Sequence, residues 1–390
     1  MILKISTAWL QLKHEKLRFL VAIGGISFAV VLIFMQLGLR AALFDSAVAL
    51  HNKLEGEIFF ISPRSTALIA MENFSERRLY QALAFKEVED VIPIYLGFAQ
   101  WKNPQTRNYW RNIYVIGFDL NRNVFNLLGV NKNLNKLKEP DVVLFDDASR
   151  TEFGPVAQEF NQKGSVVTEI GDRGPGNRKI TVVGLFTLGT SFGADGNLIT
   201  SDLNFLRIFL QRQKGFINMG VVQIKPGYDV NKLIKAMRKK FPQDIKILSK
   251  QEFMDFEKNY WDSTTPIGFV FAFGVVLGSI VGIIIVYQIL YSNVSEHLAE
   301  YATLKAMGYK HRYLLSVIFQ EAVILAILGY IPGFFITLGM YKTAREATKL
   351  PVMMEPFRAF LVLILTFLIC FISGAIAMRK LQEADPADIF

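Results

Sequence analysis

Four long apolar segments constrain the fold of this 390-residue chain more than any other feature. A bilayer core needs about 20 apolar residues per helix, and residues 19–39, 267–291, 313–341 and 357–378 meet that length. With 52% hydrophobic and 20% charged residues, the chain is too apolar for one soluble domain and too polar for a helix bundle alone. We therefore predict an α-helical membrane protein with four transmembrane helices and one large α+β extracytoplasmic domain, residues 40–266, inserted between helices 1 and 2.

The first apolar segment also resembles a cleaved signal peptide, because it has a basic start and the sequence Ala-Val-Ala at 47–49. Its apolar part is longer than that of a typical signal peptide and three further spans follow, which favours an uncleaved anchor. Residues 5–18 fit either an amphipathic helix in the membrane interface or an ordinary basic flank. Both interpretations of this N-terminal stretch stay open.

The distribution of basic residues predicts that both termini are cytosolic. With the N-terminus inside, the three cytosolic pieces hold nine Lys and Arg residues, and the short outer loop holds three. The predicted order is a cytosolic N-terminal helix (1–18), span 1 (19–39), the outer domain (40–266), span 2 (267–291), a cytosolic helix (292–312), span 3 (313–341), an outer loop (342–356), span 4 (357–378) and a cytosolic tail (379–390).

The outer domain shows alternating strand patterns and several amphipathic helix patterns. Strands are predicted at 57–61, 91–98, 112–118, 141–145, 165–170, 179–186 and 220–225. Helices are predicted at 75–84, 201–211, 230–241 and 250–260, with Ser75, Ser201 and Asp229 as N-caps. The strands concentrate at about 97–200, which predicts a strand-rich subdomain there.

Two glycine-rich loops in the outer domain carry no recognisable chemistry. Residues 171–179 lack the G-x-x-x-x-G-K-[ST] spacing of a phosphate loop and are flanked by strands, which favours a hairpin or a flexible loop. Residues 187–196 fit a mobile or partner-contacting tip, although loop chemistry alone also explains them.

The residues show no convincing catalytic or metal-binding set. The four histidines have no metal-ligand spacing, and the single cysteine, Cys370, lies in an apolar run. The adjacent acids Asp146-Asp147 and Glu89-Asp90 are more typical of solvated turns than of an acid/base pair. The net charge of +9 is scattered, without the basic stripe and aromatic residues of a nucleic-acid site. We therefore predict a non-catalytic subunit with no metal, no cofactor and no nucleic-acid partner.

Small and polar residues within the spans predict close helix packing. Gly274, Gly278 and Gly282 lie on one face of the second span, which fits either a homodimer seam or packing within the chain. Glu321 lies about two turns into the third span, where a hydrogen bond to a neighbouring helix is favoured over proton coupling. Pro332, followed by glycine, can kink the third span or give it a static bend.

The short charged segment 300–308, between the second and third spans, is the strongest functional signal in the sequence. It reads Glu-Tyr-Ala-Thr-Leu-Lys-Ala-Met-Gly. Ser295 can N-cap this helix, Glu296 favours its N-terminal end and Gly308 fits the position after its last turn. A helix of this kind lies at the membrane surface and can bind a soluble partner; a solvated helix without a partner is the other interpretation.

This segment resembles the coupling helix of MacB/FtsX-type ABC transporter permeases, roughly [RT]-E-[IYF]-[AG]-x-[LM]-[RK]-A-[LM]-G. The match comprises Glu300, Tyr301, Ala302, Lys305, Ala306, Met307 and Gly308. Ala299 stands where the family often has arginine or threonine. The C-terminal tail, from Ala377 to Asp388, and the order of spans and outer domain also resemble the family. Within the family, the amino-acid sequence of this segment looks most like that of the cyanobacterial DevC-type exporter permeases.

The resemblance implies a permease subunit in the bacterial inner membrane with a large periplasmic domain. It implies a permease homodimer, a separate ABC ATPase that binds ATP and magnesium, a periplasmic membrane-fusion protein and an outer-membrane TolC-like channel. The implied cargo is lipid, glycolipid or other envelope material, moved by mechanotransmission. Alternatives are an FtsX-like regulator of an envelope hydrolase, whose outer domain tends to be smaller, and a lipoprotein-extracting permease. An anchored adhesion or sensor protein without an ATPase is a third class, against which the coupling segment argues.

Overall fold

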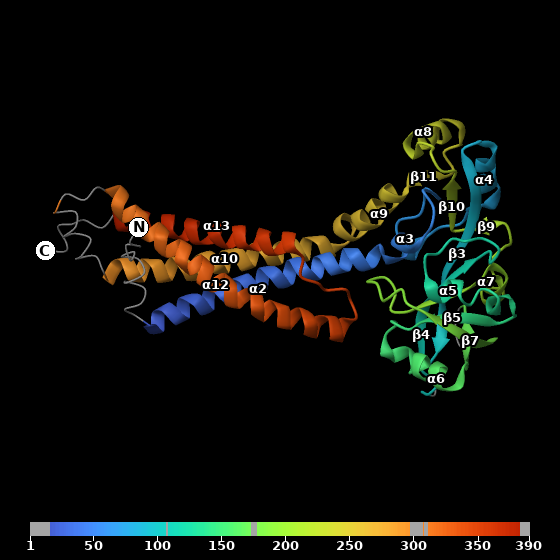
Figure 1. Ribbon diagram of the computed structural model, residues 1–390, viewed down its shortest axis with the longest axis horizontal. Coiled ribbons are helices and arrows are strands. Elements are labelled where there is room, and N and C mark those ends of the chain that lie inside the picture. The colour runs from blue at the N-terminus through green and yellow to red at the C-terminus, as the bar shows by residue number, and fades with distance from the viewer. Residues whose placement is uncertain (1–15, 107, 173–177, 297–306, 308–310, 383–390) are drawn as a thin grey trace. The chain divides into compact units, whose positions relative to one another are not determined.

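The computed structural model describes residues 16–106, 108–172, 178–296, 307 and 311–382, which divide into two compact units (Figure 1). The helical unit comprises Met1–Ala42, Ile267–Thr348 and Val352–Phe390. The sheet unit comprises Leu43–Pro266 and Lys349–Pro351. The chain therefore enters the sheet unit after Ala42 and leaves it after Pro266.

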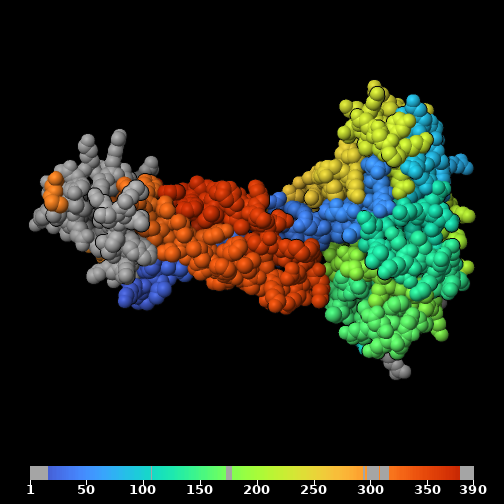
Figure 2. Space-filling view, in the orientation of Figure 1, coloured from blue at the N-terminus to red at the C-terminus, as the bar shows by residue number. Residues whose placement is uncertain are grey.

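Four long helices supply the described part of the helical unit. They are α2 (Lys16–Ala47), α10 (Pro266–Glu296), α12 (His311–Thr348) and α13 (Pro356–Gln382). All four are long and apolar enough to cross a membrane, by length and composition. The prediction of four apolar helices of spanning length is thus confirmed, and their topology stays a prediction. In Figure 2 the side chains of α12 and α13 cover much of the visible face of this unit.

The loop predicted at 342–356 is wrong in its first half, because α12 continues to Thr348. Residues 342–348 are mostly good helix formers, and Thr348 Oγ1 donates to Ala344 O at 2.7 Å. The helix then ends at Lys349, whose φ of 60° is the left-handed conformation common after a last turn. Pro351 follows two residues later and cannot continue a helix.

The sheet unit is built on one nine-stranded mixed sheet with the order β11-β1-β10-β3-β4-β8-β5-β7-β6. Its strands are β1 (Ile58–Ile61), β3 (Val88–Lys102), β4 (Trp110–Phe118), β5 (Val142–Asp146), β6 (Val166–Gly171), β7 (Arg178–Phe186), β8 (Asn197–Ser201), β10 (Met219–Ile224) and β11 (Lys246–Ser249). A second, two-stranded sheet pairs β2 (Phe74–Ser75) with β9 (Phe216–Ile217). The α-helices of this unit are α3 (Ala49–Lys53), α4 (Glu76–Tyr80), α5 (Leu128–Asn131), α6 (Val156–Lys163), α7 (Asp202–Ile208), α8 (Val230–Lys240) and α9 (Lys250–Asn259).

The large sheet has a hydrophobic core on each face. Successive side chains of a strand point to opposite faces, so the neighbours Phe59 and Phe60 enter different cores. Trp101 and Phe145 fill the core that contains Phe60, whereas Tyr114 lies in the core that contains Phe59. Burial on both faces explains why β1, β5 and β8 have no exposed residue.

The seven predicted strands are present, but two further strands of the large sheet were missed. Both β8 and β11 are short, with five and four residues, and neither shows a clear alternating pattern in the sequence. The hairpin predicted at 171–179 is confirmed by the antiparallel pairing of β6 with β7, although 173–177 lie outside the described residues. The subdomain boundary predicted at residue 97 falls inside the unbroken strand β3, and this division stays a prediction.

The predicted helix caps are confirmed at two of three positions. The Ser201 side chain accepts from Asn204 N, and the Asp229 side chain accepts from Asn231 N and Lys232 N. Ser75 occupies the N-cap position of α4 without a side-chain cap bond, so its predicted role is wrong. Ser249, which was not predicted, forms a complete capping box with Glu252 at the start of α9.

Candidate functional site

The segment predicted to dock an ATPase lies almost wholly outside the described residues. Within 300–308 only Met307 is described, in a turn, with its side chain 63% exposed. The helices before and after it are described: α10 ends at Glu296 and α12 begins at His311. The docking role of this segment therefore stays a prediction.

The glycine face of the second span packs against α2 of the same chain. A Cβ added at Gly278 would lie 3.3 Å from Ile33 Cγ1, and one at Gly282 would lie 3.1 Å from Ala29 Cβ. At Gly274 an added Cβ would overlap the side-chain amide of Gln36. These contacts support the interpretation of close packing within the chain. A homodimer seam at this face stays a prediction.

Glu321 is buried inside the helical unit, on α12. Its Oε2 atom has no hydrogen-bond partner among the described residues, so the predicted bond to a neighbouring helix is not made at this oxygen. Burying a carboxyl oxygen without a hydrogen-bond partner costs free energy, and such acids within membrane helices often have a function. Helix α12 continues through Pro332, eleven residues further along, and the predicted kink there stays a prediction.

The helices that carry the chain into and out of the sheet unit are tied to each other. Lys250, the first residue of α9, donates from Nζ to Leu54 O at 2.8 Å, the carbonyl just after α3. The His51 ring of α3 lies 4.2 Å, centroid to centroid, from the Phe253 ring of α9. Phe253 also stacks on Phe59 of β1 at 5.1 Å. The incoming and outgoing segments thus share contacts with one edge of the sheet.

A buried cluster around Glu257 extends this link to the middle of the sheet. Glu257 accepts hydrogen bonds from Leu68 N at 2.7 Å and from Trp261 Nε1 at 2.9 Å. Tyr114, on the central strand β4, donates from its hydroxyl to Leu68 O at 2.6 Å. The Trp261 ring meets Phe192 edge-on at 5.2 Å. We call these five residues, Leu68, Tyr114, Phe192, Glu257 and Trp261, the junction cluster.

Asp146 anchors the loop that carries Phe192, contrary to the prediction of a solvated turn acid. Its carboxylate is fully buried and accepts from Leu188 N and Gly189 N, both at 3.0 Å, and from Asn197 Nδ2 at 2.8 Å. Burial nevertheless raises the pKa of Asp146, because desolvation outweighs these bonds. Asp147 alone behaves as predicted and is exposed. The missed signal is that Asp146 directly continues the apolar run 142–145.

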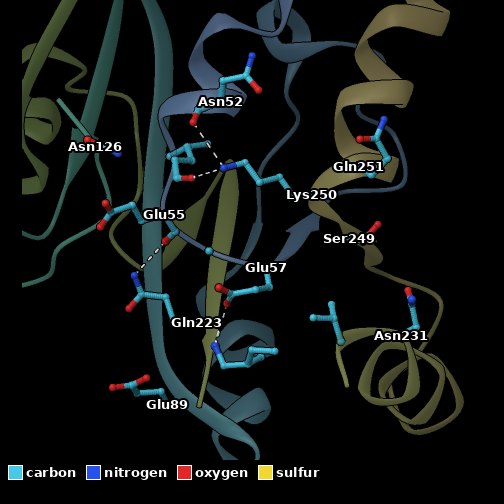
Figure 3. Close-up of a pocket in the computed structure, with 14 residues that line it drawn as sticks. Asn52, Glu55, Glu57, Glu89, Asn126, Gln223, Asn231, Ser249, Lys250 and Gln251 are labelled. Atoms are coloured by element: carbon cyan, nitrogen blue, oxygen red, sulfur yellow. Dashed lines mark hydrogen bonds between the residues drawn. The ribbon is translucent and has the colours of Figure 1, made fainter. Parts of the chain in front are cut away.

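A cleft of the sheet unit, about 800 Å³ in volume, lies beside α9 and offers polar groups without a catalytic arrangement (Figure 3). Most of its polar contacts join protein segments: Gln223 Nε2 donates to Glu55 O at 2.9 Å, and Ile224 N donates to a Glu57 carboxylate oxygen at 3.0 Å. No group of three or more metal-ligating side chains occurs among the described residues. The polar groups that line the cleft therefore serve mainly to connect β1, β10 and α9.

Two buried titratable groups, Glu257 of α9 and His51 of α3, predict an unusual dependence of stability on pH. Burial raises the pKa of Glu257 from its ordinary 4.5 to about 7. Between these two pH values the folded state keeps a proton that the unfolded state has lost. The resulting stabilisation is present at low pH and is lost as the pH rises through about 7. Burial, and secondly Lys250, lower the pKa of His51 to about 3, so its contribution falls below pH 6.5, where the unfolded histidine binds a proton.

Above pH 6.5 the unfolded His51 still loses part of its proton, but this contribution is the same in the wild type and in a Glu257 variant, so the effect of Glu257 is separable as a difference. Between pH 6.5 and 8 we expect the unfolding free energy of the wild type to fall by about 1 kcal/mol relative to that of Glu257→Gln. Denaturant unfolding followed by tryptophan fluorescence measures it. Asp255→Asn, an exposed acid on the same helix, is the matched control and should keep the wild-type slope. An unchanged slope in Glu257→Gln would contradict the assignment.

Comparison with known families agrees with this architecture. The model of the MacB-like periplasmic core domain matches residues 19–240, more than half of the chain, and the model of the FtsX-like permease C-terminal region matches residues 269–386. The chain therefore belongs to the MacB/FtsX-type permease family. Members of this family are ABC-type permease subunits, which are generally non-catalytic and work with an ABC ATPase.

Two solved structures are similar to part of this chain. The periplasmic region of MacB from Actinobacillus actinomycetemcomitans is 10% identical, with a TM-score of 0.34, and the match covers 52% of this chain and 93% of that one. The extracellular domain of the noncanonic ABC-type transporter YknZ from Gram-positive bacteria is 11% identical, with a TM-score of 0.33, covering 50% and 100%. The search of curated proteins finds no match.

Proposed function

We propose that this chain is the permease of an ATP-driven exporter that works by mechanotransmission, also called type VII. In this mechanism movement of the membrane helices drives the outer domain, and cargo does not pass down a lumen between the spans. The observation that carries the proposal is the junction cluster. It ties the outgoing segment, through Glu257 and Leu68, to Tyr114 on the central strand β4. A displacement of the outgoing segment would therefore act directly on the sheet.

The proposed assembly contains two copies of this permease and two copies of an ABC ATPase that binds ATP and magnesium. The segment 300–308 would dock on the ATPase, since its motif residues resemble a coupling helix. The ion pair between Arg18 of α2 and Glu296 of α10 joins the ends of the first two spans just before that segment. Such a pair would let both helices respond to a movement of the docked segment.

The DevC-like sequence of the segment 300–308 supports the presence of a periplasmic membrane-fusion protein and a TolC-like outer-membrane channel as partners. It also supports a lipid or glycolipid cargo. In this arrangement the protein lies in the inner membrane with both termini in the cytoplasm and the sheet unit in the periplasm. The size of the sheet unit, Leu43–Pro266, favours transport over an FtsX-like regulator of an envelope hydrolase. Extraction of lipoproteins is a second transport function within the same mechanism.

A comparison of envelope lipids tests the cargo class. We expect cells lacking this chain to lose its lipid or glycolipid cargo from the outer envelope and to retain it in the inner membrane. Mass spectrometry of the two separated membranes measures this distribution, and complementation with the wild-type chain should restore it. Unchanged lipids together with altered cell-wall cleavage would favour the regulator, and retained lipoproteins would favour extraction.

A further inference from the structure

The chain leaves the sheet unit through a segment with the features of a hinge. After α9 the backbone forms a π-helical turn, Tyr260–Thr264, and then becomes extended at Thr265 before α10 begins at Pro266. Pro266 has no N–H, so it cannot bond a carbonyl of the preceding turn; the Thr265 hydroxyl donates to Trp261 O at 2.7 Å instead. Single π-helical turns are frequent at functional sites. The helical hydrogen-bond ladder is therefore interrupted at the point where the chain passes toward the second span.

Trp261, within this π turn, is held from two sides. Glu257, one turn earlier, accepts from its indole Nε1 atom. Phe192, at the tip of the loop 187–196, meets its ring edge-on with an interplanar angle of 75°, a favoured geometry for two aromatic rings. Trp261 is only 6% exposed, whereas Phe192 is 50% exposed. The loop thus covers the tryptophan with a side chain that itself remains half in solvent.

The loop 187–196 is hydrogen-bonded to the rest of the sheet unit at its ends, whereas the hydrogen bonds described for its tip run within the tip, from Ser191 N to Ala194 O and from Ala194 N to Ser191 Oγ. Asp146 fixes its first residues through Leu188 N and Gly189 N, and Asn197, just after its end, donates to Gly189 O at 3.0 Å. The tip lies close to Ile69, since a Cβ added at Gly193 would be 2.4 Å from Ile69 Cγ2. The Thr190 hydroxyl is buried without a hydrogen-bond partner among the described residues, which disfavours the closed position.

We propose that the loop 187–196 is a strap that holds the π-turn hinge against the sheet through the contact of Phe192 with Trp261, and that this contact opens during each transport cycle. Because the ends are hydrogen-bonded to the sheet unit and the tip is held by side-chain packing, the tip can release without unfolding the sheet. Release would free Trp261 and let the π turn change its hydrogen-bond register. Phe192 is then a positioning residue for the outgoing helix. The cyclic opening, unlike the strap itself, rests on the proposed function.

A buried cysteine in the strap can report its opening. Ala194 is 6% exposed, and replacing it with cysteine in a Cys370→Ser background leaves one thiol in the chain. The full-length protein is placed in lipid nanodiscs and the rate of maleimide labelling is measured. We expect Phe192→Ala, and independently Gly193→Val, which would push the tip away from Ile69, to raise the rate about tenfold by favouring local opening. Phe216→Ala, a partly exposed phenylalanine on β9, is the matched control and should leave the rate unchanged.

Two outcomes overturn the strap, and a third concerns only the proposed function. Equal labelling rates in the wild type and both strap variants would show that Phe192 does not hold the loop. With the partner ATPase bound, ATP turnover should raise labelling at least about threefold over ADP, as expected for a strap that opens in each cycle. No increase, while the chain still stimulates the ATPase, would contradict cyclic opening. Absence of any stimulation would instead count against the proposed function, and the nucleotide-free rates would still decide the strap.

Discussion

Glu300→Lys is expected to abolish stimulation of the partner ATPase by the permease, while the protein still inserts in the membrane at normal levels. The substitution reverses a charge in the segment proposed to dock on the ATPase, and like charges across an interface suppress association. Gly308→Pro should have the same effect by a different route. Proline cannot adopt the left-handed conformation that glycine provides after a last helical turn. ATP hydrolysis by the reconstituted complex, with and without each variant, measures the loss.

A matched charge reversal separates docking from general electrostatics. Glu346→Lys makes the same change at an exposed position near the C-terminal end of α12, away in sequence from the docking segment, and should keep full stimulation. Membrane fractionation and size-exclusion chromatography control for insertion and folding. Normal ATPase stimulation by both Glu300→Lys and Gly308→Pro would remove the docking role from this segment.

Asp146→Ala is expected to destabilise the sheet unit strongly. It removes the acceptor of the partly buried Leu188 N and Gly189 N, and one of the two acceptors of the buried Asn197 Nδ2. Each unsatisfied buried donor costs about 1–3 kcal/mol, and allowing for relaxation we expect a loss of about 3 kcal/mol or more in unfolding free energy. Asp146→Asn keeps the shape and one acceptor oxygen, so its loss should be smaller.

Denaturant unfolding of the full chain, followed by tryptophan fluorescence, measures this effect. Asp147→Ala is the natural control, because Asp147 is the next residue, is exposed, and accepts a bond only from the Thr187 hydroxyl among the hydrogen bonds described. It should change the unfolding free energy by less than about 1 kcal/mol, as is usual for surface positions. Equal effects of the two alanine variants would show that the Asp146 carboxylate does not anchor the strap.

The spanning helices could be predicted from the sequence because their signal is local. Twenty apolar residues in a row identify a span without knowledge of any partner, and longer strands such as β3 and β4 show periodic patterns of their own. Boundaries were less predictable. The last turns of α12 were missed because residues 342–348 are polar, and hydropathy does not distinguish a polar helix from a loop.

The junction cluster and the anchor at Asp146 could not be predicted, because their decisive contacts join residues far apart in the sequence. Glu257 bonds the backbone of Leu68, 189 positions away, and Asp146 bonds Asn197, 51 positions away. A lone acid in a sequence carries no sign of such a partner, so Asp146 was interpreted as a turn residue. One local signal was available: Ser249 and Glu252 have the capping-box spacing that starts α9. The docking segment remains a sequence-based prediction, since its residues are mostly outside the described part of the chain.

Isolation of the assembled complex tests the central claim most directly. The tagged protein is extracted from its native membrane in mild detergent, and the bound chains are identified by mass spectrometry. We predict an ABC ATPase together with a membrane-fusion protein, and loss of the ATPase from the Glu300→Lys variant. An ATPase with a cell-wall hydrolase would favour the regulator. The absence of any ATPase, under conditions that preserve known complexes of this class, would contradict the account.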